Sequence, residues 1–244
     1  AFELFSRAAA KDDPVALNHV GMCYADGVGV KRDDQQACRH YRKAAEKGLA
    51  AAQNNLGLAY LNGQGVSKSP GSATRWFLRA AEQGFAQAQN NLAYCYMNGI
   101  GVAKDPEEAN RWYQAAADSG LTEALVNLAW NYLMGVGGPV NYEKAVELLE
   151  RAAAADVPSA QCNLAYHYRF GLGVDRSPER AFALYKRAAE QGYFEAFLPV
   201  AECHELGEGT PQNLYLAVQY YQRAAQYGDR RAMGKLKSLA AQGP

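Results

Sequence analysis

The sequence predicts an all-α fold, a right-handed α–α superhelix (solenoid) of six 36-residue helix–turn–helix repeats with a half repeat at each end. Three observations lead to this prediction: a column of alanines at a fixed period, a pair of glycines after each first helix, and a second helical pattern after the glycines. The period holds without insertion or deletion through Ala16, Ala52, Ala88, Ala124, Ala160, Ala196 and Ala232.

The composition narrows the classes of partner. Of 244 residues, 49% are hydrophobic, which is enough to bury a substantial core. The 25 basic and 25 acidic residues cancel, so the chain has no general attraction for nucleic acid or anionic lipid. No apolar run approaches the ~18 residues that a membrane-spanning helix needs. We therefore expect no nucleic-acid partner and no direct insertion into a membrane.

An i, i+4, i+8 pattern predicts the first helix of each repeat, which we call helix A. Residues at this spacing lie on one face of a helix. Four residues after the alanines come Val20, Leu56, Leu92, Leu128, Leu164, Val200 and Leu236, and eight residues after them come Tyr24, Tyr60, Tyr96, Tyr132, Tyr168 and His204. A Gly-x-Gly sequence then ends the helix, as at Gly27 and Gly29, because glycine adopts positive φ without strain.

The second helix, helix B, opens with another alanine column, at Ala37, Ala73, Ala109, Ala145, Ala181 and Ala217. An aromatic residue follows four positions later in most repeats, and an alanine doublet such as Ala44-Ala45 comes next. Small residues let two helices approach closely while aromatic rings fill the space between them. A glycine ends helix B in every repeat except the fourth, where Asp156 replaces it.

These columns fix the predicted boundaries. One solenoid domain spans residues 1–244, with a half repeat at 1–15, repeats at 16–51, 52–87, 88–123, 124–159, 160–195 and 196–231, and a C-terminal capping helix at 232–244. We expect thirteen helices, no sheet, an elongated arc with the B helices on its convex side, and the least regular stacking at repeats four and six. Because both ends fall inside a repeat, we expect the chain to be a fragment of a longer protein.

The pattern A-x-x-x-L-[GA]-x-x-Y-x-x-G-x-G-V followed by A-x-x-[WHLY]-[YF]-x-x-A-A-x-x-G resembles the Sel-one-like repeat (SLR) family, which is related to the tetratricopeptide repeat. The resemblance covers essentially the whole chain. It implies a bacterial adaptor or scaffold that binds proteins, and it names no partner. It also implies that helix A lines the concave surface.

The sequence favours a protein without catalytic activity or a cofactor. The Gly-x-Gly turns lack the lysine and the Ser/Thr of a nucleotide-binding loop and recur in all six repeats, which favours a structural turn. The four histidines lack the spacing that zinc sites use, and we interpret them as packing residues and expect no metal. No Ser/His/Asp, Cys/His or paired-carboxylate arrangement is evident.

Five cysteines are too few for a disulfide scaffold. Cys23, Cys95 and Cys203 share one phase and are interpreted as small buried residues, whereas Cys162 is considered as a reactive thiol. Some secreted members of the resembled family bridge their helix pairs, so a Cys23–Cys38 bridge stays open. Unpaired cysteines favour a cytoplasmic location, and a periplasmic or secreted one stays open because the chain does not begin with Met.

The candidate binding site consists of two columns on helix A. The columns are three positions apart in the sequence and therefore lie on one face of the helix. Asparagine recurs where packing does not demand it, and large aromatic residues recur beside it. An exposed tyrosine or tryptophan typically anchors a partner. The predicted protein- or peptide-binding residues are Asn55, Asn91, Asn127, Asn163, Tyr94, Trp130, Tyr166, His19, Leu58 and Glu202.

Two classes of function remain. The first is an adaptor or scaffold that binds a peptide or protein loop in its concave groove. The alternative is an inhibitor or immunity-type protein that binds and blocks a folded toxin or enzyme. In either case we expect a protein or peptide partner and a monomer or weak oligomer.

Overall fold

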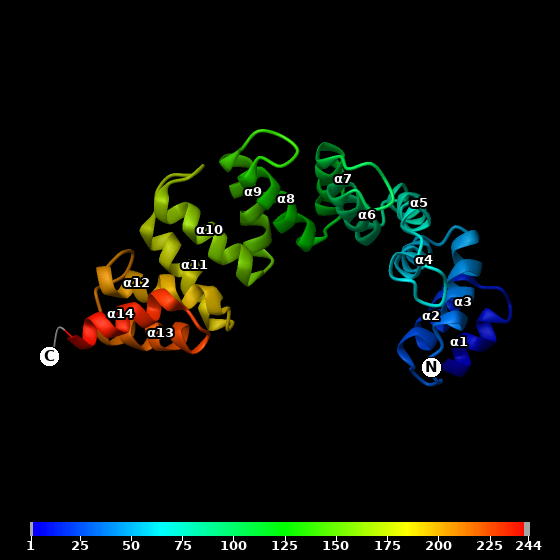
Figure 1. Cartoon of the computed structure of the whole chain (residues 1–244), viewed down its shortest axis with the longest axis horizontal. Coiled ribbons are helices and arrows are strands. Elements are labelled where there is room, and N and C mark those ends of the chain that lie inside the picture. Colours follow the sequence, from blue (N-terminus) through cyan, green and yellow to red (C-terminus); the bar gives the residue numbers. More distant parts are fainter. Residues whose placement is uncertain (1, 242–244) are drawn as a thin grey trace. The chain divides into compact units, whose positions relative to one another are not determined.

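The computed structural model describes residues 2–241, and this part of the chain holds fourteen α-helices, one 3-10 helix and no strand (Figure 1). The all-α fold class and the succession of helix pairs are confirmed. The expected number of thirteen helices is wrong, because six repeats supply two helices each and each half repeat adds one more. Ala1 of the predicted half repeat and residues 242–244 of the predicted capping helix lie outside the described residues.

The chain forms two compact units. The first runs to Ala124 and includes Val136–Gly138, and the second comprises Leu125–Gly135 and the chain from Pro139 onward. That residues 1–244 make one solenoid domain stays a prediction.

In the first compact unit, A helices and B helices alternate, and each packs against the next along the chain. The A helices are α2 (Pro14–Asp26), α4 (Ala50–Asn62) and α6 (Ala86–Asn98), and the B helices are α1 (Phe2–Ala9), α3 (Asp34–Glu46), α5 (Pro70–Ala81) and α7 (Pro106–Asp118).

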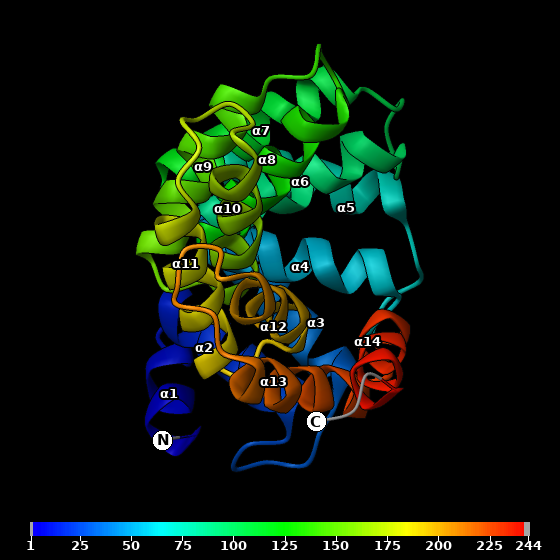
Figure 2. The ribbon, with the colours of Figure 1, turned by 90° about the vertical axis from the view of Figure 1, so that its left-hand side faces the viewer.

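The second compact unit has the same alternation, and α9 to α14 pack in sequence order (Figure 2). Its A helices are α8 (Thr122–Met134), which starts at the division between the units, α10 (Pro158–Phe170), α12 (Phe197–Leu206) and α14 (Arg230–Ala241). Its B helices are α9 (Tyr142–Ala154), α11 (Pro178–Glu190) and α13 (Leu214–Gln226), and a 3-10 helix, η1 (Phe194–Ala196), precedes α12.

The predicted columns form the core. Leu56, Leu92 and Leu128 of the A helices are fully buried, and so are Phe77 and Tyr221 of the aromatic column in helix B. The alanine columns are buried as well. Because alanine has almost no side-chain volume, helices A and B approach closely and the larger side chains fill the remaining space at the density of a protein interior.

The two glycines of each Gly-x-Gly turn have different roles. Gly99 ends α6 in the left-handed conformation, with a φ of 69°, and its N–H donates to the carbonyl oxygen of Cys95. A Cβ added to Gly101 would lie 2.3 Å from the carbonyl oxygen of Pro70, the first residue of α5 in the preceding repeat. The second glycine therefore permits contact between successive repeats, in addition to its role in the turn.

The departures of repeats four and six from the sequence pattern have different structural effects. In repeat four, Asp156 adopts the left-handed conformation of the glycine that it replaces, with a φ of 66°, and both helices keep thirteen residues. In repeat six, α12 is shortened to ten residues and is preceded by η1. Pro199 lies in the first turn of α12, where its missing N–H leaves no α-helical hydrogen bond unmade.

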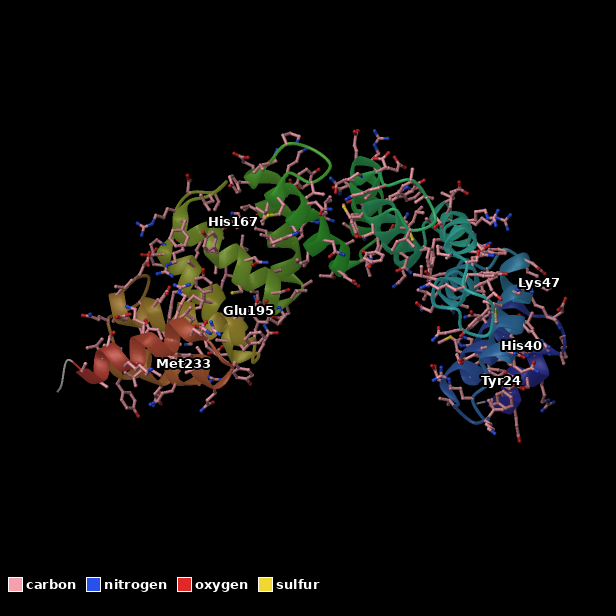
Figure 3. All side chains as sticks on the ribbon, viewed as in Figure 1. Tyr24, His40, Lys47, His167, Glu195 and Met233 are labelled. Atoms are coloured by element: carbon pink, nitrogen blue, oxygen red, sulfur yellow. The ribbon has the colours of Figure 1, made fainter. Side chains whose placement is uncertain are left out.

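Three of the histidines pack as the sequence predicts. The ring of His40 stacks on that of Tyr24 with centroids 5.7 Å apart, and the two residues lie side by side in Figure 3. His204 meets the ring of Phe182 edge-on at 5.1 Å, and Nδ1 of His167 lies 2.8 Å from the Leu172 carbonyl oxygen. Among residues 2–241, no cluster of three or more His, Cys, Asp or Glu side chains could hold a metal ion. None of the helices described is long and apolar enough to cross a membrane.

Candidate functional site

The aromatic column of the A helices is exposed. The side chains of Tyr94 on α6, Trp130 on α8 and Tyr166 on α10 have exposed fractions of 51%, 57% and 51%. Tyr94 belongs to the first compact unit, whereas Trp130 and Tyr166 belong to the second. None of these rings is needed to fill the core, because the leucine and alanine columns of the same helices already do so.

The asparagine column has a structural role that sequence reasoning missed. Nδ2 of Asn55 donates to Oδ1 of Asn18 across 3.0 Å, and Nδ2 of Asn91 donates to Oδ1 of Asn54 across 2.8 Å. The acceptors are buried, whereas the donors are half-buried. Each bond joins an A helix to the A helix of the preceding repeat, so these carboxamides hold neighbouring repeats together.

Asn163 differs from these residues. Val126 stands one repeat earlier, in the column that supplies the acceptors Asn18 and Asn54. Valine has no side-chain acceptor, and the carboxamide of Asn163 is exposed with no hydrogen-bond partner within residues 2–241. Asn127, one repeat earlier in the same column, is half-buried.

The other predicted binding residues, His19, Leu58 and Glu202, lie in three different environments. The His19 ring stacks on Phe5 of α1 with centroids 4.6 Å apart. Leu58 and Asn55 line a cavity of about 280 Å³ in the first compact unit. Glu202 on α12 forms ion pairs with Arg169 and Arg231 and is mostly buried. His19 and Glu202 are thus already engaged within the fold.

A second cavity, of about 260 Å³, lies between α10 and α12 in the second compact unit. Three predicted residues line it: Asn163, Tyr166 and Glu202. The rings of Tyr166 and Phe170 make one wall, with centroids 4.7 Å apart, and Pro199 also lines the cavity. We call this space the α10–α12 cavity.

Arg169 lines the α10–α12 cavity and organises a charge network. Its Nη1 donates to Glu202 across 2.8 Å and its Nε to Glu208 across 2.9 Å, and its side chain is only 10% exposed. Glu202 also accepts from Arg231 on α14 across 2.6 Å, and Glu208 accepts from Arg176 across 2.9 Å. The network thereby connects three successive A helices.

Sequence reasoning missed Arg169 and Glu208, although each is a charged residue in a column that is mostly apolar in the other repeats. Arg169 falls in a column that holds Leu61, Met97 and Leu133 in the three preceding repeats. Glu208 falls in a column that is apolar in four of the five other repeats: Val28, Ile100, Val136 and Leu172. A charged residue at an apolar repeat position indicates a local specialisation of the surface.

A second exposed apolar column was also missed. Met134, Phe170 and Leu206 lie four residues after the aromatic column and have exposed fractions of 52%, 51% and 63%. The same column carries Asp26, Asn62 and Asn98 in the first compact unit. The A helices of the second compact unit therefore expose more apolar surface than those of the first.

All five cysteines are free, so Cys23 and Cys38 are not bridged. Burial raises the pKa of the Cys162 thiol to about 12, which disfavours the thiolate that a reactive cysteine needs near neutral pH. Cys95 and Cys203 are buried as predicted, whereas Cys23 is only half-buried.

Two solved structures of repeat proteins are similar to this chain in sequence and in fold. A protective antigen of uropathogenic Escherichia coli that displays an SLR fold is 31% identical over 99% of this chain, with a TM-score of 0.92, and the chain spans about half, 52%, of that antigen. A Sel1 repeat protein from Oxalobacter formigenes is 33% identical over 88% of this chain and 86% of its own, with a TM-score of 0.73.

An immunity protein from Pseudomonas aeruginosa is 21% identical over 87% of this chain and 81% of its own. Its TM-score of 0.47 is too low to support an argument about function. No curated protein matches the chain in sequence.

The Sel1 repeat model matches seven segments of the sequence, at residues 1–13, 14–49, 50–85, 86–121, 122–157, 158–193 and 200–229. The full-length matches begin two residues before the boundaries that the alanine column predicts, and they keep the same period of 36 residues. The chain belongs to the Sel1 repeat family, whose fold is of the protein-interaction type.

Proposed function

We propose that this chain is a non-enzymatic adaptor or scaffold that binds a peptide or a protein loop in the groove lined by its A helices. One observation carries the proposal: Trp130 and Tyr166 in the second compact unit, and Tyr94 in the first, each expose about half of their surface although the core is already filled by the leucine and alanine columns. Leaving a large ring in water has a cost that burial against a partner recovers, and tryptophan and tyrosine dominate the energetics of many protein interfaces.

The asparagine column supports the same groove. A carboxamide carries two N–H donors and an acceptor oxygen. Asn55 and Asn91 each use one donor toward the preceding repeat, which fixes the orientation of the side chain and leaves the second N–H and the oxygen for a ligand. Side chains that are held in place before binding lose less conformational entropy when the partner arrives.

Site-specific photo-crosslinking tests which face the partner occupies. A photoreactive phenylalanine analogue replaces Trp130 or Tyr166 on the A helices, or Arg187 on α11 as the matched control, in cells that carry the gene. The proposal expects the same protein partner to be captured from positions 130 and 166 and not from position 187. Capture from position 187 alone would reject the proposal.

The form of the partner separates the two functional classes. A synthetic peptide that spans the crosslinked segment should bind by itself if the chain is an adaptor. If only the folded partner binds, and the chain suppresses its activity, the chain is an inhibitor or immunity-type protein instead.

A further inference from the structure

We infer that the α10–α12 cavity is the specificity pocket of the proposed groove and that it accepts a protein segment in which an apolar side chain stands next to an acidic one. The inference rests on the proposed function, which it refines from a groove to a named pocket and a partner chemistry.

The size of the cavity fits a side chain. Its volume of about 260 Å³ is below the ~300–1,000 Å³ of pockets that enclose whole small molecules. The rings of Tyr166 and Phe170 and the side chains of Leu198 and Pro199 give it an apolar lining. The cavity therefore has room for a large apolar side chain of a partner.

The charge of the lining favours an anion. Arg169 and Arg231 contribute two positive charges and Glu202 one negative charge, so the ionised lining groups sum to one positive charge. Helix α14, which supplies Arg231, carries no acidic residue and three further cations, Arg230, Lys237 and Lys235, of which Lys235 is paired with Glu205 on α12. An acidic side chain beside the apolar anchor would meet this excess of cations.

Arg169 offers a hydrogen-bond donor that the protein does not use. Nε and Nη1 are occupied by Glu208 and Glu202, whereas Nη2 has no acceptor within the described part of the chain. The side chain is nine-tenths buried and lines the cavity. A buried guanidinium whose position is fixed by two carboxylates and whose third nitrogen is unpaired is well placed to receive an oxygen from a ligand.

The pocket departs from the repeat pattern in a coordinated way. Arg169, Glu202 and Glu208 each place a charge where other repeats mostly carry apolar or aromatic residues, and Arg169 forms an ion pair with each of the two glutamates. A charge that is buried by a single substitution would be costly, whereas here the buried guanidinium is paired with two carboxylates. The stacking of the other repeats does not use these charges, so the sequence places them here for a local purpose.

A peptide selection tests the inference. A phage-displayed library of random dodecapeptides is selected on the purified chain, and the enriched peptides are titrated against three variants. The first is the triple variant Arg169→Leu, Glu202→Tyr, Glu208→Leu, in which each position takes the residue that its column has in an earlier repeat. The second is Arg231→Gln, whose side chain is 74% exposed and whose replacement should not disturb folding. The third, Trp130→Ala, removes an aromatic residue outside this pocket.

The inference expects peptides in which Asp or Glu adjoins a large apolar residue. The triple variant should weaken their binding at least tenfold and Arg231→Gln a few-fold, and both the wild type and Trp130→Ala should lose affinity as salt is raised, because added salt screens the ion pair. The inference is overturned if no peptide is enriched, if the enriched peptides lack acidic residues, or if neither pocket variant weakens binding. Peptides that depend on Trp130 and ignore both pocket variants would overturn this inference and leave the A-helix groove standing.

Discussion

Asn91 on α6 donates a hydrogen bond from Nδ2 to Oδ1 of Asn54 on α4, across 2.8 Å and 37 residues of sequence. The asparagines that recur at one position of the repeat therefore meet asparagines that recur one position earlier, in the repeat before. The column that suggests ligand binding also stabilises the stack, and the two roles can be separated by mutation.

Asn91→Ala should lower the free energy of unfolding by about 1 kcal/mol, because the buried oxygen of Asn54 is left without its donor. Asn163→Ala is the matched control, since its carboxamide has no partner within residues 2–241 and its loss should change stability by only a few tenths of a kcal/mol. Urea unfolding measures both. Equal losses in the two variants would contradict this division of roles.

The two glycines of one turn should differ in their tolerance of a side chain. Gly99→Ala introduces left-handed strain of about 1–2 kcal/mol, and its Cβ would lie no closer than 3.3 Å to Lys104. Gly101→Ala adds to similar strain a Cβ at 2.3 Å from the Pro70 oxygen and 2.4 Å from its carbonyl carbon. Thermal unfolding should therefore show the larger loss for Gly101→Ala, and the reverse order would refute the inter-repeat role of the second glycine.

Much of the fold could be predicted from the sequence, because the helices and their buried columns follow from local periodicity. Phe77 and Leu92 are buried where the pattern places them. The contacts that define the candidate site could not be predicted in the same way, because they join different columns of neighbouring repeats. The Arg169–Glu202 pair spans 33 residues and the Arg169–Glu208 pair 39, so neither coincides with the period of 36.

The buried His204 side chain should make the stability of the fold decrease at acidic pH. The side chain is 7% exposed, its Nδ1 has no hydrogen-bond partner, and burial lowers its pKa below the ordinary value. Below that ordinary pKa the unfolded chain binds a proton more readily than the folded chain, so the contribution of His204 to stability is present at higher pH and is lost as the pH falls. His204→Tyr, which restores the column, should reduce the loss of stability between pH 7 and pH 5. An unchanged pH profile for this variant would contradict the assignment.

The most direct test of the account is the affinity of the crosslinked partner for Trp130→Ala and for Arg187→Ala, measured by calorimetry under the same conditions. Trp130 is 57% exposed on an A helix, whereas Arg187 on α11 pairs with Asp156 across 2.9 Å. The account predicts that Trp130→Ala costs about 2 kcal/mol or more, roughly 30-fold in affinity, while Arg187→Ala binds like the wild type. If Arg187→Ala loses binding and Trp130→Ala keeps it, the A helices are not the binding face.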